Sequence, residues 1–353
     1  MQESAGLAYW QDSLSQFSHP NLVSDWSYVT GIVTVVDDDV VKVTLPFAAN
    51  VLLAEMSDWF RGQHPNTTFN IEVSPRKLAA HLPQSVNGVK NIIAVTSGKG
   101  GVGKSTTAVN LALALAKSGA RTALLDADIY GPSVPLMLGC KDATLEVTEQ
   151  KRMLPIMAHG IECHSIGFLM GKDDAAIWRG PMASKALNQL LNETQWHDVD
   201  YLVIDMPPGT GDIQLTLAQQ IAVTGAVVVT TPQDLALADA TKGIAMFEKV
   251  DVPVLGIVEN MSYHICSECG HHEAIFGNGG AEKLAAQKGV ALLTQIPLHI
   301  TIREDIDLGM PTLARNEERE PFYSLYLNLA ERIASQMYWQ GRVVPDEIAI
   351  KMV

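Results

Sequence analysis

The sequence predicts an α/β protein with a doubly wound, mostly parallel sheet, preceded by a small α+β domain. Three observations support this fold class. From Asn91 onward, short apolar segments alternate with helical patterns, which is typical of a parallel sheet covered on both faces. A glycine-rich turn joins the first of these strands directly to a helix. With 353 residues, the chain is long enough for a large core and a second small domain.

Residues 1–75 are expected to form the small α+β domain. The pattern predicts helices over 7–17 and 48–60, and strands over 28–36, 40–45 and 68–73. This part of the sequence contains no cysteine, no nucleophile–base pair and no metal-ligand spacing. We therefore expect a partner-docking module. Residues 76–90 are rich in polar residues and include Pro83 and Gly88, which predicts a linker.

Residues 91–345 are expected to form the large α/β domain. Its predicted strands cover 92–95, 121–128, 161–166, 201–205, 226–230, 254–258 and 290–296. Its predicted helices lie near 184–193, 213–224, 235–249 and 280–289, and a closing helix runs from Pro321 to Gln340.

The segment after the first strand of this domain carries a phosphate-binding pattern. Gly98 is followed, after four residues, by Gly103-Lys104-Ser105, with a strand before and a helix after. Glycines let successive N–H groups converge on one point, and the helix adds its positive dipole end. Lys104 is predicted to contact the β- and γ-phosphates of ATP, and Ser105 to ligate Mg²⁺. A plain surface turn is disfavoured because strand, loop, Lys-Ser and helix are all in register. The predicted nucleotide contacts are Gly98, Lys99, Gly100, Gly101, Val102, Gly103, Lys104, Ser105 and Thr106.

Two later strands end in carboxylates at the edge where open α/β sheets bind ligands. Asp126 and Asp128 alternate at the end of one strand, so they are expected on the same side of it. Asp205 ends an apolar strand and precedes a Pro-Pro-Gly turn, which is the arrangement that delivers a carboxylate to Mg²⁺ or its water. An aspartate that only caps a turn is the alternative for each residue alone. Because these aspartates occur in the same sequence as a phosphate loop, a role at the nucleotide site is favoured over turn capping.

The last motif is Cys266-x-x-Cys269, in a loop rich in glycine and histidine. Two thiolates at this spacing can hold one metal ion or one edge of a cluster. A redox dithiol normally begins a helix, whereas this pair follows a strand. Cys140 and Cys163 are isolated and far away in sequence, and buried apolar roles are expected for them. Two such loops on the two-fold axis of a dimer would supply four thiolates, for zinc or for a [4Fe–4S] cluster.

These segments resemble the Mrp/ApbC family of P-loop NTPases of the deviant Walker A type, a group that includes MinD, ParA and nitrogenase iron protein. The similar stretches are GKGGVGKS, DADIYGPS, DMPPGTGD and NMSYHICSECGHHEAIFGNGG, and the resemblance covers about residues 90–340. It implies a homodimer that sandwiches ATP, in which Lys99 reaches the nucleotide of the partner subunit. It further implies that Asp128 positions the attacking water and that Asp126 lies near the hydration shell of Mg²⁺.

The same resemblance implies that Cys266 and Cys269 of both subunits bridge a [4Fe–4S] cluster. Asn260 matches the base-contacting asparagine of the wider group, and its amide could pair with adenine. An ordinary turn role is the alternative for this residue. The stretch 178–182 also resembles the family, but no role for Arg179 follows from the residues.

Composition bounds the partners of the chain. Apolar residues make up 47% and charged residues 18%, as in an ordinary soluble globular protein. The formal net charge of −14 disfavours non-specific binding to nucleic acid or to anionic membranes. The sequence has no secretory signal pattern, no apolar run approaching the roughly 18 residues of a membrane span, and too few cysteines for a disulfide framework. We therefore expect a cytoplasmic protein.

The expected function is that of an ATP-hydrolysing carrier, slow in turnover, which passes its cluster to apo-proteins. A partitioning ATPase like MinD or ParA is one alternative, but it would need a basic membrane or DNA-binding surface. The helix over 322–340 has no basic stripe. An electron donor that resembles nitrogenase iron protein is another, but such donors usually place their cluster cysteines singly.

Overall fold

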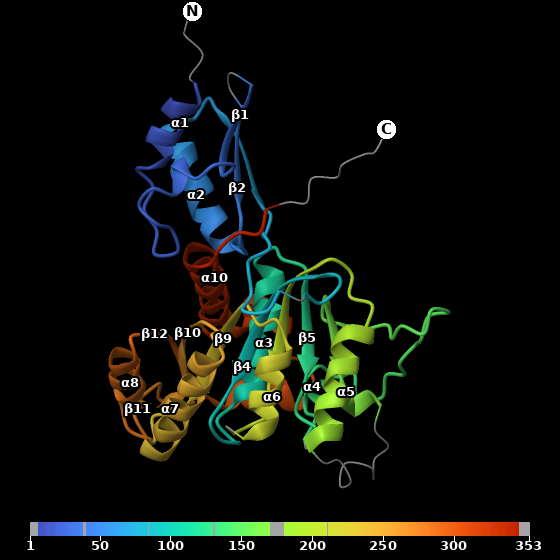
Figure 1. Ribbon diagram of the computed structural model, residues 1–353. Helices are drawn as coiled ribbons and strands as arrows, with labels where there is room; N and C mark the ends of the chain where they lie inside the picture. Colours follow the sequence, from blue (N-terminus) through green and yellow to red (C-terminus); the bar gives the residue numbers. More distant parts are fainter. Residues whose placement is uncertain are drawn as a thin grey trace, which may run out of the picture.

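The computed structural model describes residues 6–37, 40–83, 85–129, 131–169, 180–209 and 211–345, apart from the side chains of 180–184, 212 and 317. A small sheet with its helices lies at one end of the molecule and a large α/β unit at the other (Figure 1). The predicted fold class is confirmed, because the large sheet is mostly parallel and helices cover both of its faces.

The small sheet has the order β1-β2-β3, in which β2 is antiparallel to β1 and parallel to β3. Its core is aromatic, since Trp10 of the first helix and Phe60 of the second both pack on Phe69 of β3. Both helices therefore cover the same face (Figure 1). The elements are α1 (Leu7–Leu14), β1 (Val33–Asp37), β2 (Val40–Leu45), α2 (Asn50–Gln63) and β3 (Thr68–Val73).

The first strand is shorter than the predicted range of 28–36. Trp26–Tyr28 forms a 3₁₀ turn, and the indole N–H of the buried Trp26 donates to the carbonyl of Phe17 at 3.1 Å. Burying this tryptophan holds the chain away from the sheet, which it joins only at Val33.

The large sheet has the order β11-β10-β9-β4-β8-β5-β7-β6, and β12 pairs with β10. Its central strands are parallel, whereas β6 and β11 at the two ends are antiparallel to their neighbours. The strands are β4 (Val89–Thr96), β5 (Thr122–Asp126), β6 (Ile156–Ala158), β7 (Ile161–Ser165), β8 (Val199–Asp205), β9 (Gly225–Thr230), β10 (Val254–Ile265), β11 (His272–Glu273) and β12 (Ala291–Leu298).

Alternate residues of the central strands divide between two cores, as the two-residue period of a strand requires. Ile93 and Val95 belong to a core that includes α3, α4 and α10, whereas Ile92 and Ala94 belong to one that includes α5, α6 and α7. The helices are α3 (Lys104–Lys117), α4 (Val134–Met137), α5 (Gly180–Glu193), α6 (Asp212–Gln220), α7 (Asp234–Lys249), α8 (Gly280–Lys288), α9 (Ile300–Asp307) and α10 (Phe322–Gln340).

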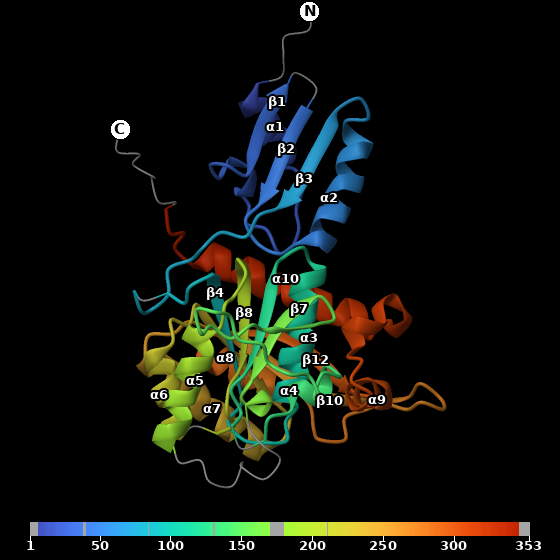
Figure 2. The same cartoon turned by 90° about the vertical axis from the view of Figure 1, so that its right-hand side faces the viewer.

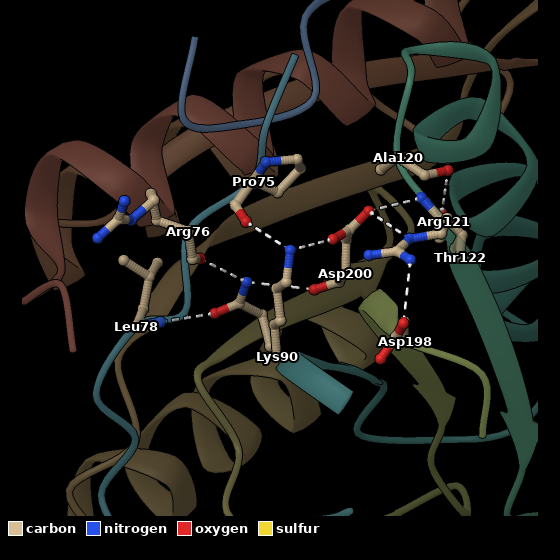
Figure 3. A network of polar contacts seen from close by, with 10 residues as sticks. Pro75, Arg76, Leu78, Lys90, Ala120, Arg121, Thr122, Asp198 and Asp200 are labelled. Atoms are coloured by element: carbon tan, nitrogen blue, oxygen red, sulfur yellow. Dashed lines mark hydrogen bonds and ion pairs between the residues drawn. The ribbon is translucent and has the colours of Figure 1, made fainter. Parts of the chain in front are cut away.

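The segment predicted as a linker is fixed to the large sheet by a polar network (Figure 3). The ammonium of Lys90 donates to the carbonyl of Pro75 at 3.0 Å and to the buried carboxylate of Asp200 at 2.7 Å. The amide of Asn91 binds the backbone of Arg76 and of Leu78. These hydrogen bonds therefore fix the backbone of this segment against the sheet.

The small sheet unit is docked on α10, which lies between the two parts of the molecule (Figures 1 and 2). The carboxylate of Glu331 accepts the backbone N–H groups of Val51 and Leu52, at 2.7 and 3.1 Å, in the first turn of α2. The amide of Asn50 donates to the carbonyl of Lys117 at the end of α3. The small unit thus touches the far end of the helix that follows the phosphate loop. None of the helices in the described part of the chain is long and apolar enough to cross a bilayer.

Candidate nucleotide site and thiol hairpin

The phosphate loop lies between β4 and α3, as the sequence predicts. Gly103 adopts the left-handed conformation with a φ of 85° and is the residue before the first turn of α3. The hydroxyl of Ser97 donates to the carbonyl of Lys99 at 2.8 Å, and the N–H of Gly209 donates to the carbonyl of Ser97. The loop is therefore closed on itself and tied to the turn after β8.

Two glycines of the loop are required by close neighbours. A Cβ atom at Gly98 would lie 2.3 Å from the carbonyl carbon of Asp239 in α7. A Cβ atom at Gly103 would lie 1.9 Å from Nδ2 of Asn260, in addition to the strain of its positive φ. Asn260 itself donates from Nδ2 to the carbonyl of Val102 at 2.8 Å. The predicted base-contacting asparagine thus lies directly against the phosphate loop.

Lys104 and Asp205 meet beneath the loop. Both side chains are buried, and the ammonium of Lys104 forms a short hydrogen bond with Oδ1 of Asp205. The ammonium also lies 3.3 Å from the hydroxyl of Ser105. Oδ2 of Asp205 is buried without a hydrogen-bond partner among the described residues. A buried carboxylate oxygen left open beside a serine hydroxyl is the donor set expected of a Mg²⁺ site.

Asp126 ends β5 directly beside Asp205, its register partner on β8. Oδ1 of Asp126 accepts the N–H of Asp128 at 3.1 Å. Oδ2 accepts the N–H of Val134 and the hydroxyl of Ser165, each at 3.1 Å. Burial, and then the charge of Asp205, raises the pKa of Asp126 to about 7. Asp126 therefore anchors the segment that carries Asp128, which is half-buried at the same edge.

Two residues that sequence reasoning missed support this edge. Ser165 ends β7 and binds Asp126. Gln214 of α6 is buried and donates to the hydroxyl of Thr96 in a short hydrogen bond, and to the carbonyl of Pro207 at 3.2 Å. No motif points to Ser165, because it meets Asp126 only through a strand that is remote in the sequence, whereas the position of Gln214 just after the DMPPGTGD stretch was the one available signal. The predicted Lys99 is half-buried, and no partner of its ammonium is found among the residues that the structure describes. Arg179 lies outside those residues.

The cysteine pair lies at the tip of a hairpin. Instead of ending near residue 258, β10 continues to Ile265, because its end pairs with β11: His264 lies opposite Glu273, and Ile265 opposite His272. The N–H of Cys266 donates to the carbonyl of His271 at 3.0 Å, and the N–H of Gly270 returns to the carbonyl of Cys266 at 2.9 Å. The predicted loop is therefore an ordered turn, here called the thiol hairpin (residues 262–273).

Both thiols of the hairpin are accessible, since Cys266 is half-buried and Cys269 exposed. The backbone N–H of Cys269, then that of Glu268, and the thiol of Cys269 lower the pKa of Cys266. Across the described residues, no group of three or more His, Cys, Asp or Glu side chains is arranged to hold a metal. One chain thus presents two thiol ligands, one of which is already biased toward the thiolate form.

Cys140 and Cys163 are not isolated in space. Their sulfur atoms lie 3.9 Å apart, which corrects the expectation from their separation in sequence. Cys163 is buried on β7, as predicted, and Cys140 is half-buried after α4. The pair lies beside the strand that carries Asp126, because Cys163 is the register partner of Leu124 on β5.

Comparison with known proteins adds the following findings. The family model described as NUBPL iron-transfer P-loop NTPase matches residues 88–334. The chain is 56% identical to the iron-sulfur cluster carrier protein of Haemophilus influenzae, over 97% of this chain and 95% of that protein. The carrier protein of Escherichia coli K12 is 54% identical over the same shares. The iron-sulfur cluster transfer protein NUBPL of Dictyostelium discoideum is 48% identical over 72% of this chain and 78% of its own.

Two solved structures with the same fold are a nucleotide-binding protein and a cell division ATPase. The nucleotide-binding protein of Archaeoglobus fulgidus in complex with ADP is 37% identical, with a TM-score of 0.59, over 67% of this chain and 93% of that one. The cell division ATPase MinD of Pyrococcus furiosus has a TM-score of 0.53 over 69% of this chain and 98% of its own. At 24% identity, the likeness to MinD shows the fold alone.

Proposed function

The chain belongs to the NUBPL iron-transfer family of P-loop NTPases, and from this premise we propose that it is an ATP-dependent iron–sulfur cluster carrier. In this proposal two copies of the chain hold one [4Fe–4S] cluster between them and pass it to apo-proteins in the cytoplasm. The observation that carries the proposal is the accessible pair Cys266 and Cys269 on an ordered hairpin, at the end of the strand whose Asn260 contacts the phosphate loop.

The nucleotide half of the proposal is supported by the residues at the loop. Gly100 and Gly101 face open space, which would leave room for a phosphate chain, and the first turn of α3 follows directly after the loop. We propose that Lys104 leaves Asp205 to bind the β- and γ-phosphates of ATP. Asp205 and Ser105 would then hold Mg²⁺, and the ion would spread the phosphate charge. Asp128, held by Asp126, would orient the attacking water.

The dimer half of the proposal follows from ligand count. A cubane cluster takes four thiolates, and the thiol hairpin supplies two. A second copy related by a two-fold axis would supply the other two. Lys99 is then free to reach the nucleotide of the partner subunit, as the resemblance implies. Mg·ATP would favour one arrangement of the two subunits, and hydrolysis would release it, which changes the grip on the cluster.

The experiment that tests this proposal is anaerobic reconstitution with iron and sulfide, followed by iron, sulfide and zinc analysis. We expect about four irons per dimer. Cys266→Ala and Cys269→Ala should each lose the cluster, whereas Cys140→Ala should retain it, since that thiol lies beside Cys163 of β7 and not on the thiol hairpin. Stoichiometric zinc that resists replacement, or full iron and sulfide in a strict monomer, would refute the proposal.

A further inference from the structure

We propose that Glu259 is a positioning residue that makes the base of the thiol hairpin rigid, so that nucleotide in the phosphate loop controls the hairpin and its hold on the cluster. This inference rests on the proposed function, which supplies the nucleotide and the cluster. The physical basis is the strand β10. The middle of this strand contacts the phosphate loop through Asn260, and Cys266 follows directly after the last residue of the strand.

The nucleotide end of this connection is Asn260. Its amide donates to the carbonyl of Val102, and its Nδ2 fills the space where Gly103 lacks a side chain. Asn260 is itself buried. Because packed groups of this kind leave no free volume, a shift of the loop on binding phosphate must displace Asn260 as well.

Directly after Asn260 the strand changes direction. Met261 has a φ of 53°, a conformation that costs free energy in any residue other than glycine. The pairing of β10 with β12 shifts its register between Asn260 and His264. The pairing with β9 ends one residue earlier, where Glu259 lies opposite Thr230. The strand therefore enters the hairpin through a strained joint at Met261, and it pairs with β12 again only at His264, opposite Leu298.

Glu259 spans this joint. Its fully buried carboxylate accepts the hydroxyl of Ser262 at 2.6 Å, on the hairpin side. It also accepts the amide of Gln295 in β12 at 2.7 Å, and the N–H of Ala281 in the first turn of α8 at 3.1 Å. Gln295 in turn donates to Ser262 at 3.1 Å. One carboxylate thus joins the base of the hairpin to both flanking elements.

These contacts decide how a displacement of Asn260 is distributed. With Ser262 fixed to Glu259, the strained joint cannot absorb the movement, and the hairpin follows. Without that hydrogen bond, the chain can rotate at Met261, and the thiols at Cys266 and Cys269 no longer respond to the loop. Burying a carboxylate costs free energy unless all of its hydrogen bonds are made. Apolar side chains would fill the same volume without that cost, so filling the core does not explain why Glu259 is a carboxylate.

The test compares Glu259→Gln and Ser262→Ala with the wild type in two measurements. The first is hydrogen exchange of the amides of residues 262–273 in the cluster-free protein, with and without Mg²⁺ and a non-hydrolysable ATP analogue. The second is the rate at which a ferrous-iron chelator removes iron from the reconstituted protein, with and without the same analogue. In the wild type we expect the nucleotide to change both rates by about fivefold or more.

In both variants we expect the ratio of rates with and without nucleotide to fall to about one, while nucleotide affinity stays within about threefold of wild type. Ser262→Thr keeps the hydroxyl and should restore the ratio. Glu162→Gln is the matched control: Glu162 is another buried carboxylate of the same sheet, bound to the N–H of His197 far from β10, and its variant should keep the wild-type ratio.

A wild-type ratio in Glu259→Gln and Ser262→Ala would overturn the inference, and so would a wild type that binds both nucleotide and cluster with a ratio of one. Failure of the wild type to bind either one would refute the proposed function instead. If Glu259→Gln does not fold, the comparison of Ser262→Ala with Ser262→Thr decides, since those two differ at the hydroxyl and a methyl group.

Discussion

At the scale of single residues, the charges under the phosphate loop are arranged before any phosphate is present. Lys104 is neutralised by Asp205, and Asp205 keeps one oxygen without a partner among the described residues. A buried ion pair of this kind is costly to break from one side, because the remaining charge is left unpaired. Asp205 therefore holds the ammonium of Lys104 in place at the loop before a phosphate binds.

We expect Lys104→Ala to lower ATP hydrolysis by about a hundredfold or more, because the phosphates lose their main positive contact. Cluster content after reconstitution should stay at the wild-type value, since the thiol hairpin is unchanged. Steady-state phosphate release and iron analysis measure both. Lys117→Ala, at the exposed far end of the same helix, is the control. Equal turnover in wild type and Lys104→Ala would place the catalytic centre elsewhere.

The pH dependence of stability should report Asp126. Its pKa is about 7 in the folded protein against an ordinary value of 3.8, so the folded state binds a proton more tightly than the unfolded state does. The contribution of this group to stability is therefore highest below about pH 4, and is lost as the pH rises toward 7. In Asp126→Asn, the melting temperature of the nucleotide-free protein should fall less than in the wild type between pH 5 and 8. Parallel curves would show that Asp126 is ionised throughout.

At the scale of elements, local patterns were predicted well and remote pairings were not. The strand, loop and helix around Gly103 and Lys104 are adjacent in the sequence, so their geometry follows from local rules. The length of β10 does not follow from local rules, because the end of this strand is defined by the pairing of Ile265 with His272. Glu259 looks like an ordinary strand residue until Ser262 and Gln295 are seen beside it.

The two cysteine pairs should differ in reactivity, because they lie on different elements and differ in exposure. At pH 7.5 we expect iodoacetamide to modify Cys266 and Cys269 at least about tenfold faster than Cys163, because both hairpin residues are accessible and the pKa of Cys266 is lowered. The hydrogen bond with the thiol of Cys140, and then burial, raise the pKa of Cys163. Peptide mass spectrometry of timed samples measures each rate. Equal rates at Cys163 and Cys266 would mean that β7 is open to solvent.

At the scale of the whole molecule, the small sheet unit is held by the last helix. Glu331 is buried in α10 and accepts two N–H groups of the first turn of α2, where the helix dipole also favours a carboxylate. In Glu331→Ala these donors lose their partner, at a cost of about 1–3 kcal/mol. We expect the small unit to detach, giving faster limited proteolysis of residues 76–90. Gln336→Ala, elsewhere on α10, is the comparison. Unchanged cleavage would show that apolar packing alone holds the two parts.

The position of Glu331 also has a consequence for biosynthesis. The surface on which residues 6–73 dock is provided by a helix that leaves the ribosome after every strand of the large sheet. During most of translation the N-terminal unit therefore lacks its contacts with α10, only the end of α3 is present to meet it, and the first turn of α2 lacks the carboxylate of Glu331. Nascent chains stalled before residue 322 should carry this unit as a separate, protease-sensitive body, and chains released after residue 345 should not.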